Sequence, residues 1–339
     1  MKRVCVTGAG GFIGSHLAKK LRGMGYYVVG ADWKHPDADC IRADESCDEF
    51  HLVDLRKYDN CLRVTAGCAH VYQLAADMGG MGFIQSNHSA CIFNNSLINL
   101  HVLEACRINE VERVFYSSSA CVYPEHLQLD ERAIGLKETH AWPAKPQDAY
   151  GLEKLFAEEA YAHYGRDFGM TIRMARFHNV YGPYGTWKGG REKVPAALCR
   201  KIAASDDALE IWGDGEQTRS FIYVDDLVEG VLRVMFSDDA RLQGVAINIG
   251  TEELVSIDRL ADEIMRIACK ELRVVHVPGP EGVRGRNSDN SMMREVLGWE
   301  PATSLRNGLE RTYEWIRSRA SNDSSYERSA VVRQEMIPL

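Results

Sequence analysis

The 339-residue sequence lacks several features that would assign it to a specialised class of protein. It has no apolar run near the roughly 18 residues that a membrane-spanning helix needs. Basic residues are not in excess, since 40 Lys and Arg stand against 48 Asp and Glu, for a net charge of -8. A surface that binds nucleic acid is normally basic, so this balance argues against one. Repeats and low-complexity segments are missing too, which favours an ordinary globular enzyme.

Cysteines spaced for metal binding or redox chemistry are also missing, although the chain has ten cysteines. No two of them form a C-x-x-C pair, and we therefore predict no metal site. A strand-like stretch within residues 1–7 leaves no room for an export signal, so we expect a cytoplasmic protein with reduced thiols. Most of these cysteines are then expected to be small core residues.

What the sequence does contain is a regular alternation of strand-like and helical segments. Short β-branched runs at 3–6, 27–31, 49–53, 70–74, 114–118 and 171–176 alternate with amphipathic segments such as 12–22 and 97–108. This pattern predicts βαβ units and an α/β fold, a Rossmann-type doubly wound parallel sheet. We expect residues 1–176 to form mainly this domain and 177–320 mainly a smaller mixed α/β substrate domain, with some chain crossing back. Residues 321–339 are expected to be a polar tail.

A glycine-rich loop follows the first predicted strand and opens the first predicted helix. Glycines there allow a tight turn and let backbone N–H groups reach a pyrophosphate at the helix N-terminus. Asp32, at the end of the second strand, is placed to bind an adenosine ribose and to repel a 2′-phosphate. The sequence therefore predicts NAD, favoured over NADP although Lys34 would help to bind a 2′-phosphate. The candidate cofactor-binding residues of the loop are Gly8, Gly10, Gly11, Phe12, Ile13 and Gly14.

An acidic residue at the end of the third predicted strand has two interpretations. Asp54 ends the run HLVD, where a carboxylate would meet the adenine amino group. It would equally serve as the cap of the following helix. Both interpretations stay open.

A tyrosine and a lysine four residues apart form the candidate catalytic pair. Tyr150 and Lys154 lie in a helix predicted from about residue 147 to 164, and this spacing puts them on one face. We expect the ammonium to lower the pKa of the phenol and to hold the nicotinamide ribose. A tyrosinate would take a hydroxyl proton while hydride leaves to NAD. With Ser119, whose hydroxyl would bond the same oxygen, the pair resembles the extended short-chain dehydrogenase/reductase superfamily.

The two residues after Ser119 discriminate among reactions within that superfamily. They are typically Ala-Thr in the 4-epimerases and Asp-Glu in the sugar 4,6-dehydratases, whereas here they are Ala120 and Cys121. A cysteine suits proton transfer at carbon, because its pKa lies nearer neutrality than that of a carboxylate. The alternative is a small residue packed beside the strand.

Long segments of the chain resemble the GDP-mannose 3,5-epimerases, a family of NAD-dependent isomerases. The resemblance runs from residue 4 to about 316 and departs mostly at 35–46, at 125–136 and in the tail. It is carried by AADMGGMGFIQSNHS (75–89), SSACVYPE (118–125), AWPAKPQDAYGLEKL (141–155), RFHNVYGPYGTWKGGREK (176–193), WGDGEQTRSF (212–221) and GPEGVRGRNSDN (279–290).

The resemblance implies a reaction and the residues that perform it. GDP-α-D-mannose would become GDP-L-galactose, with GDP-L-gulose as an alternative product, in the supply of ascorbate and cell-wall sugars. In the family, NAD accepts a hydride from C4 and returns it, and the ketone acidifies the protons on C3 and C5. Tyr150 takes the C4 hydroxyl proton, and the two inversions are assigned to Cys121 and Lys193.

Substrate contacts and a homodimer are implied as well. An acidic protein that binds an anionic nucleotide needs local positive charge, and Lys201, Arg219 and either Arg284 or Arg286 are candidates for a diphosphate clamp. We interpret His178 as a structural histidine, since no acid partner is evident. The dimer is expected through the helices around 97–108 and 148–164. The implied substrate contacts are Gly79, Ser119, Ala120, Cys121, Asn179, Glu192, Lys193, Lys201, Gln217, Arg219, Arg286 and Ser329.

Two other functions compete with this one. A 4-epimerase or dehydratase of the same fold is the first, and Cys121 and the segment 187–193 argue against it. The second is an NAD-binding regulator or RNA binder, which the intact Tyr150, Lys154 and Ser119 and the net acidity disfavour. The choice of guanine over another base rests on the resemblance alone.

Overall fold

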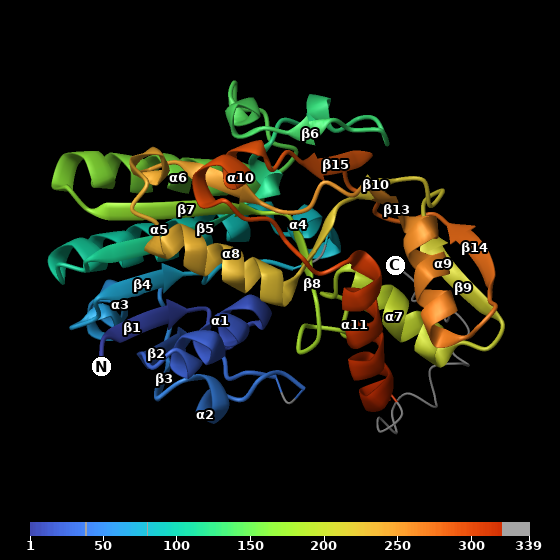
Figure 1. Ribbon diagram of the computed structural model, residues 1–339, viewed down its shortest axis with the longest axis horizontal. Helices are drawn as coiled ribbons and strands as arrows, with labels where there is room; N and C mark the ends of the chain where they lie inside the picture. The colour runs from blue at the N-terminus through green and yellow to red at the C-terminus, as the bar shows by residue number, and fades with distance from the viewer. Residues whose placement is uncertain (38, 80, 321–339) are drawn as a thin grey trace, which may run out of the picture.

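The computed structural model describes residues 1–37, 39–79 and 81–320. Its centre is a seven-stranded sheet with the order β12-β7-β5-β4-β1-β2-β3 (Figure 1), in which every neighbouring pair is parallel. The expected doubly wound α/β fold is thereby confirmed. The strands are β1 (Arg3–Thr7), β2 (Tyr27–Asp32), β3 (Glu49–Leu52), β4 (His70–Gln73), β5 (Arg113–Ser119), β7 (Thr171–Phe177) and β12 (Ala246–Ile249).

Helices cover both faces of this sheet, because its central strands are apolar on both sides (Figure 1). In β1, Val4 and Val6 belong to the core on one face, whereas Cys5 belongs to the core on the other. The first core includes side chains of α1 (Phe12–Gly23) and α8 (Val224–Phe236). The second includes side chains of α3 (Tyr58–Thr65), α5 (His88–Ile108) and α6 (Ala149–Phe168).

A second group of elements packs beside the carboxyl ends of the strands. Its helices α7 (Val194–Ala204), α9 (Ile257–Ala268) and α11 (Leu305–Ala320) extend the first core. A four-stranded sheet has the order β13-β10-β15-β6, and two further pairs are β11-β8 and β14-β9. Their bounds are β6 (Gly135–Leu136), β8 (Asn179–Tyr181), β9 (Ala208–Trp212), β10 (Thr218–Arg219), β11 (Phe221–Tyr223), β13 (Val255–Ser256), β14 (Arg273–Val277) and β15 (Gly285–Ser288).

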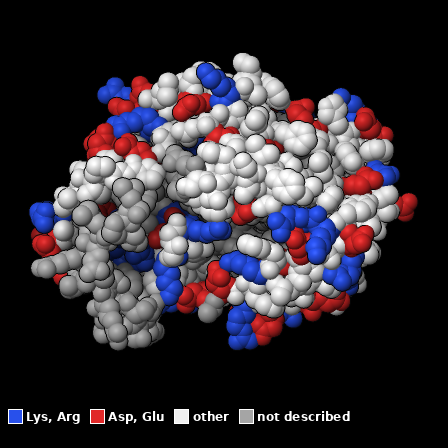
Figure 2. Space-filling view, turned by 180° about the vertical axis from the view of Figure 1, so that it is seen from behind, with Lys and Arg blue, Asp and Glu red and all other residues white. Residues whose placement is uncertain are grey.

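Short helices complete the described chain, and charges are interspersed on its surface. Acidic and basic side chains alternate over the face seen in Figure 2. No described helix is long and apolar enough to cross a bilayer. The described residues also contain no group of three His, Cys, Asp or Glu that would hold a metal ion. The short helices are α2 (Ala43–Ser46), α4 (Met81–Ser86), α10 (Ser291–Leu297) and the 3-10 turns η1 (Ala120–Val122), η2 (Glu125–Leu127), η3 (Glu138–Ala141) and η4 (Ala240–Leu242).

The ten cysteines are all free, and most of them are buried, as expected, but three are not. Cys269 is exposed, because it follows the last residue of α9 with a φ of 52° and caps the helix instead of packing beneath it. Cys40 and Cys121 are half-buried. The expectation of a core role is therefore wrong for Cys269 and incomplete for Cys40. The buried ones are Cys5, Cys47, Cys61, Cys68, Cys91, Cys106 and Cys199.

Candidate active site

The glycine-rich loop between β1 and α1 forms part of the wall of a cavity of about 400 Å³. Gly8 has a φ of 72°, and a Cβ on Gly14 would stand 2.0 Å from the carbonyl oxygen of Gly8. Gly11 caps α1 without any side-chain hydrogen bond, so the N–H groups of the first turn remain available to an anion. A Cβ on Gly10 would stand 2.6 Å from the carbonyl oxygen of Lys34. These residues therefore fit the close backbone approach that a dinucleotide pyrophosphate requires.

Two aspartates continue the cavity wall at the carboxyl ends of the next strands. Asp32 accepts hydrogen bonds from the N–H of Gly10 at 2.9 Å and of Lys34 at 3.2 Å, and burial raises the pKa of its carboxyl. The ammonium of Lys34 pairs with Asp37 at 2.8 Å, which leaves less of its charge for a 2′-phosphate. This arrangement suits NAD.

Asp54 is not the cap of the following helix, because α3 begins at Tyr58 with Lys57 as its N-cap, so the adenine contact stays a prediction. Its Oδ1 accepts the N–H of Arg56 at 2.9 Å, and its Oδ2 pairs with the Arg56 guanidinium at 2.8 Å. The same residue lines the cavity. A local turn thus holds the carboxylate at the cavity wall.

The candidate catalytic pair lies near the start of α6, which extends further than predicted. The helix begins at Ala149, with the Asp148 carboxylate accepting the Gly151 N–H at 2.8 Å, and it ends at Phe168. The Lys154 ammonium donates to the carbonyl oxygen of Ser117 at 2.8 Å and lies 5.7 Å from the centre of the Tyr150 ring. Both side chains line the cavity together with Ser119, at the end of β5.

The expected lowering of the tyrosine pKa is wrong for the protein by itself. Burial raises the pKa of Tyr150 well above its usual value, the charge of Cys121 adds to the rise, and a hydrogen bond with Ser119 opposes it. Burial also lowers the pKa of Lys154. Removal from water disfavours both charged forms, and this outweighs the attraction that spacing alone suggested.

Gly151 lets α6 approach η1 and so brings Tyr150 to Cys121. A Cβ at this position would stand 2.1 Å from the carbonyl oxygen of Cys121. The Cys121 N–H bonds the Ser119 hydroxyl oxygen at 3.2 Å. Close helix packing and this local turn therefore gather the serine, the cysteine and the tyrosine. Sequence reasoning missed the glycine, although its place directly after the tyrosine was a usable signal.

Three cationic side chains surround Cys121. The Arg286 guanidinium donates a hydrogen bond to the Cys121 sulfur at 3.4 Å. Burial and then the charge of Arg286 lower the pKa of Arg219 to about 9, and the charge of Cys121 opposes them. Lys193 lines the cavity and is exposed to it, and partial removal from water among the cavity walls lowers the pKa of its amine. Cys121 and Arg286 act on this lysine as well, so the four groups are electrostatic neighbours.

None of these three cations pairs with a carboxylate in the described part of the chain. Arg219 donates to the carbonyl oxygens of Thr218 at 2.7 Å and Val283 at 2.6 Å. Arg286 donates to the side-chain oxygen of Gln128. Arg284, the alternative for the clamp, pairs with Asp214 at 2.8 Å. The uncompensated arginines are therefore Arg219 and Arg286, which fit a ligand with several negative charges.

The remaining predicted contacts fall into two sets. Gly79 lines the cavity and Ala120 is buried beside Cys121. The structure instead brings Lys201 and Gln217 to β9, because the lysine donates to the Glu210 carbonyl at 2.8 Å and the glutamine to the Trp212 carbonyl at 2.9 Å. Ser329 lies outside the described residues.

Asn179 and Glu192 hold backbone segments near the site. Asn179 donates to the carbonyl oxygen of Ser220 at 3.0 Å. Glu192 accepts the Gly190 N–H at 2.7 Å and pairs with Arg200 at 2.9 Å. Asn179 therefore ties β8 to the residue before β11, and Glu192 ties the loop before α7 to that helix.

His178 behaves largely as interpreted from the sequence. Its Nε2 bonds the Asn248 side-chain oxygen at 3.1 Å, and burial lowers its pKa to about 3. Its buried Nδ1 has no partner, so the ring is only half satisfied. A neutral histidine with no acid partner among the described residues is a poor proton acceptor.

Other cavity-lining residues could not be selected from the sequence motifs. They include Leu74, Ala75 and Asp77 after β4 and Phe177 at the end of β7. Their common property is a place at the carboxyl ends of parallel strands, where ligands of such sheets bind. Their position after a predicted parallel strand is the signal by which they could have been found in the sequence.

Comparison with known proteins places the chain among sugar-nucleotide enzymes. The NAD dependent epimerase/dehydratase family matches residues 4–250, more than half of the chain. GDP-mannose 3,5-epimerase 1 of Oryza sativa subsp. japonica is 56% identical over 95% of this chain and 84% of its own length. The GDP-mannose 3,5-epimerase of Arabidopsis thaliana is 54% identical over the same shares. Among solved structures, UDP-glucuronic acid 4-epimerase from Bacillus cereus, in complex with UDP-glucuronic acid and NAD, has a TM-score of 0.79 at 28% identity, covering 94% of this chain and 99% of that one.

Proposed function

This chain belongs to the NAD dependent epimerase/dehydratase family, and from this membership we propose that it converts GDP-mannose to GDP-L-galactose by inversion at C3 and C5. The observation that carries the proposal is the position of Cys121. Its sulfur lies beside Arg286, its backbone bonds Ser119, and it is an electrostatic neighbour of Tyr150 and Lys193. A 3,5-epimerase needs such proton-transfer groups next to the oxidation site.

NAD is the cofactor, and its chemistry is confined to C4. The glycine loop, Asp32 and Lys154 would hold it, and when bound it supplies reversible hydride exchange with C4 of the sugar. Tyr150 takes the proton from the C4 hydroxyl oxygen and later returns it. The hydrogen bond with Ser119 favours the tyrosinate against the effect of burial. The serine thus assists proton transfer as well as binding the oxygen.

Inversion at each carbon is the task of Cys121 and Lys193. A carbonyl at C4 acidifies the protons on C3 and C5, and inversion removes a proton from one face and delivers one to the other. Cys121 follows β5 and Lys193 precedes α7, so the two groups reach the site from different elements. A lowered pKa makes the neutral Lys193 amine, which is the form that accepts a proton, more accessible.

Negative charge on the substrate would complete the cation cluster. Arg219 and Arg286 have no carboxylate partner within the described ranges, and a diphosphate supplies two negative groups next to the sugar. The nucleotide stays attached to the sugar throughout, because the bound diphosphate anchors the sugar while C3, C4 and C5 react.

We also propose a homodimer formed by α5 and α6. These helices expose large apolar side chains, among them Phe93 at 62%, Leu152 at 50% and Phe156 at 50%. A second copy would remove them from water. Analytical ultracentrifugation should give a dimer for the wild type and a monomer for a Phe93→Glu, Phe156→Glu variant. A wild-type monomer at micromolar concentration would contradict the proposal.

As the resemblance implies, we propose a cytoplasmic location and a role in ascorbate and cell-wall sugar supply.

The decisive experiment is the reaction of GDP-mannose in heavy water. Deuterium should appear at C3 and at C5 of the recovered sugar, read by mass spectrometry and NMR. Label at C5 alone would indicate a single epimerase, and no label would contradict the proposal.

A cysteine variant separates the two kinds of chemistry. Cys121→Ala should retain oxidation at C4, followed by NADH absorbance, and should lose exchange of carbon-bound hydrogen with solvent. Cys269→Ala, which changes an exposed cysteine, is the matched control and should behave as wild type. Retention of full exchange in Cys121→Ala would assign that step to another residue.

A further inference from the structure

An indole in the loop that delivers Lys193 contacts the cofactor-binding half. Trp187 lies in the stretch between β8 and α7 and is 3% exposed. Its Nε1–H donates to Oδ2 of Asp39 at 3.1 Å, a contact between residues 148 positions apart. Asp39 belongs to the segment that follows β2, the strand that ends in Asp32.

The same carboxylate also faces the last turn of α11. Its Oδ1 lies 3.7 Å from Nε of Arg319. The Arg319 guanidinium lies 4.2 Å from the ring centre of Trp315 and 5.7 Å from that of Tyr184. Asp39 therefore joins three segments distant in sequence: its own, the loop before α7, and the end of α11.

Between Trp187 and Lys193 the chain passes through two glycines with left-handed backbone conformations. Gly189 and Gly190 have φ values of 92° and 81°, and a Cβ on either would meet nothing within 4 Å. Beyond them, Glu192 pairs with Arg200 on α7 at 2.9 Å. The Arg191 guanidinium lies 4.0 Å from the ring centre of Phe83. The loop is thus held at Trp187 on one side of the two glycines and at Arg191 and Glu192 on the other.

We propose that Asp39 is a positioning residue for Lys193, acting through Trp187. The carboxylate fixes the indole, the indole fixes the loop, and the loop presents the lysine to the sugar. Asp39 does not line the cavity and touches no reacting group, so its effect is indirect. This inference rests on the proposed function for the role of Lys193, but the loop contact itself does not.

The test compares partial reactions of Asp39→Ala in heavy water. Lys193→Met first identifies the carbon whose exchange depends on the lysine. At that carbon Asp39→Ala should slow deuterium uptake by about tenfold or more, because an ångström of misplacement costs up to roughly a hundredfold. Oxidation at C4 and exchange at the other carbon should stay within about twofold of wild type.

Conservative variants exclude a merely structural role. Asp39→Asn keeps an acceptor for the indole N–H and should restore most of the lost rate, whereas Trp187→Phe should reproduce the defect of Asp39→Ala. Asp44→Ala removes an exposed carboxylate that pairs with Arg42, and it should behave as wild type. If all partial reactions of Asp39→Ala fall in proportion, or none falls, the proposal is overturned.

Hydrogen exchange of the backbone tests the contact without any substrate. Asp39→Ala should raise deuterium uptake in peptides covering residues 184–193 and leave those of α6 unchanged. Unchanged uptake at 184–193 would overturn the inference whatever the enzyme catalyses. Raised uptake in a protein whose wild type labels neither C3 nor C5 would refute the proposed function and leave the loop contact standing.

Discussion

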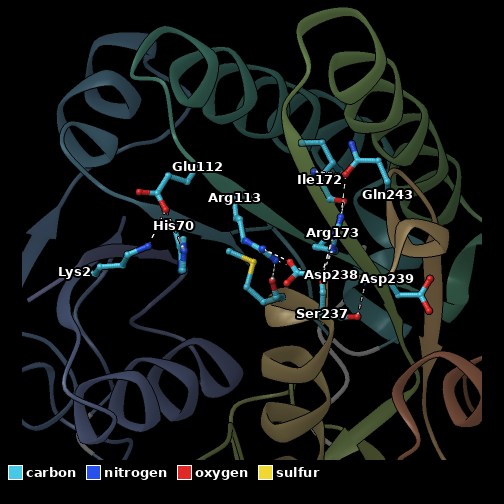
Figure 3. A network of polar contacts seen from close by, with 11 residues as sticks. Lys2, His70, Glu112, Arg113, Ile172, Arg173, Ser237, Asp238, Asp239 and Gln243 are labelled. Carbon is cyan, nitrogen blue, oxygen red and sulfur yellow. Dashed lines mark hydrogen bonds and ion pairs between the residues drawn. The ribbon is translucent and has the colours of Figure 1, made fainter.

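Arginines near the two ends of the seven-stranded sheet are in opposite circumstances. At the amino ends, Arg113 and Arg173 lie among oxygens supplied by the chain (Figure 3). Arg113 donates to the Met235 carbonyl at 3.0 Å and contacts the Asp238 carboxylate, and Arg173 donates to the Ser237 carbonyl at 2.9 Å. The acceptors stand at the C-terminus of α8, where carbonyl groups lack helical partners.

Beside the carboxyl ends, the cations of the four-stranded sheet and of the loop before α7 lack this compensation, although Arg176 near the end of β7 pairs with Glu158 at 2.7 Å. Burial and then the charge of Arg286 lower the pKa of Arg219 to about 9, and Lys193 stands beside them. No carboxylate of the described chain pairs with them. The contrast indicates that the amino-end arginines stabilise the fold, whereas the carboxyl-end cations are left for an anionic ligand.

The largest expected effect lies at the carboxyl end and concerns one hydroxyl group. Tyr150→Phe removes the proton acceptor for C4 while keeping a buried ring, so kcat should fall by about a thousandfold or more with little change in unfolding free energy. Steady-state turnover and urea unfolding measure the two quantities. Substantial C4 oxidation in this variant would point to a different base.

Acid should destabilise the protein through a histidine at this same end. The pKa of His178 is about 3 in the fold against 6.5 when unfolded, so the unfolded state takes up the proton first as pH falls. Stability from this group is full above about pH 6.5 and is lost toward pH 3, by roughly 3 kcal/mol at pH 4.

Urea unfolding between pH 7 and pH 4 checks this pH dependence. The loss should be smaller in His178→Gln and unchanged in His163→Gln, a control on the exposed side of α6. At the amino end, burial lowers the pKa of His70 as well. The loss of unfolding free energy between pH 7 and pH 4 should therefore also be smaller in His70→Gln. If the unfolding free energy falls equally with pH in His178→Gln and in wild type, His178 is not the group that destabilises the protein in acid.

Removing a cation from the carboxyl end should weaken binding and leave folding intact. Arg286→Met should lower kcat/KM by about 30- to 100-fold, mainly through KM, because charge-assisted hydrogen bonds to phosphate contribute roughly 2–3 kcal/mol. Unfolding free energy should stay level or rise, since a repulsive neighbour of Arg219 is gone. An unchanged KM would mean that the cluster does not bind the diphosphate.

The matched change at the amino end should do the reverse, with the smallest effect. Arg113→Met should cost roughly 1–2 kcal/mol of unfolding free energy, because carbonyl groups of α8 lose a donor. KM for the nucleotide sugar should not change. Turnover assays and urea unfolding on the two arginine variants, run side by side, decide whether the contrast between the sheet ends holds.

Short-range patterns carried the fold and the centre of the site. Alternating strands and helices predicted the parallel sheet, and the loop from Gly8 to Gly14 predicted the cofactor wall. A four-residue spacing put Tyr150 and Lys154 on one helix face. The neighbours of Ser119 singled out Cys121. Each of these depends on a few consecutive residues whose backbone geometry is nearly independent of the rest of the chain.

Contacts between distant residues were beyond such patterns. Arg286 reaches Cys121 across 165 positions, and Trp187 reaches Asp39 across 148. The choice between Arg284 and Arg286 needed the carboxylate of Asp214, which only folding brings close to the former.

Sequence order alone was enough for the fold class. It also predicted the cofactor loop and the reacting side chains, of which Lys193 rested on the resemblance to a family. The tertiary structure decided their charge states and their partners. Burial raises the pKa of Tyr150, which is the reverse of the expected shift. Among the described residues, folding leaves Arg219 and Arg286 without a carboxylate partner. The physical reason is that electrostatic energies depend on water exclusion and on all neighbouring charges, and both exist only once the chain is folded.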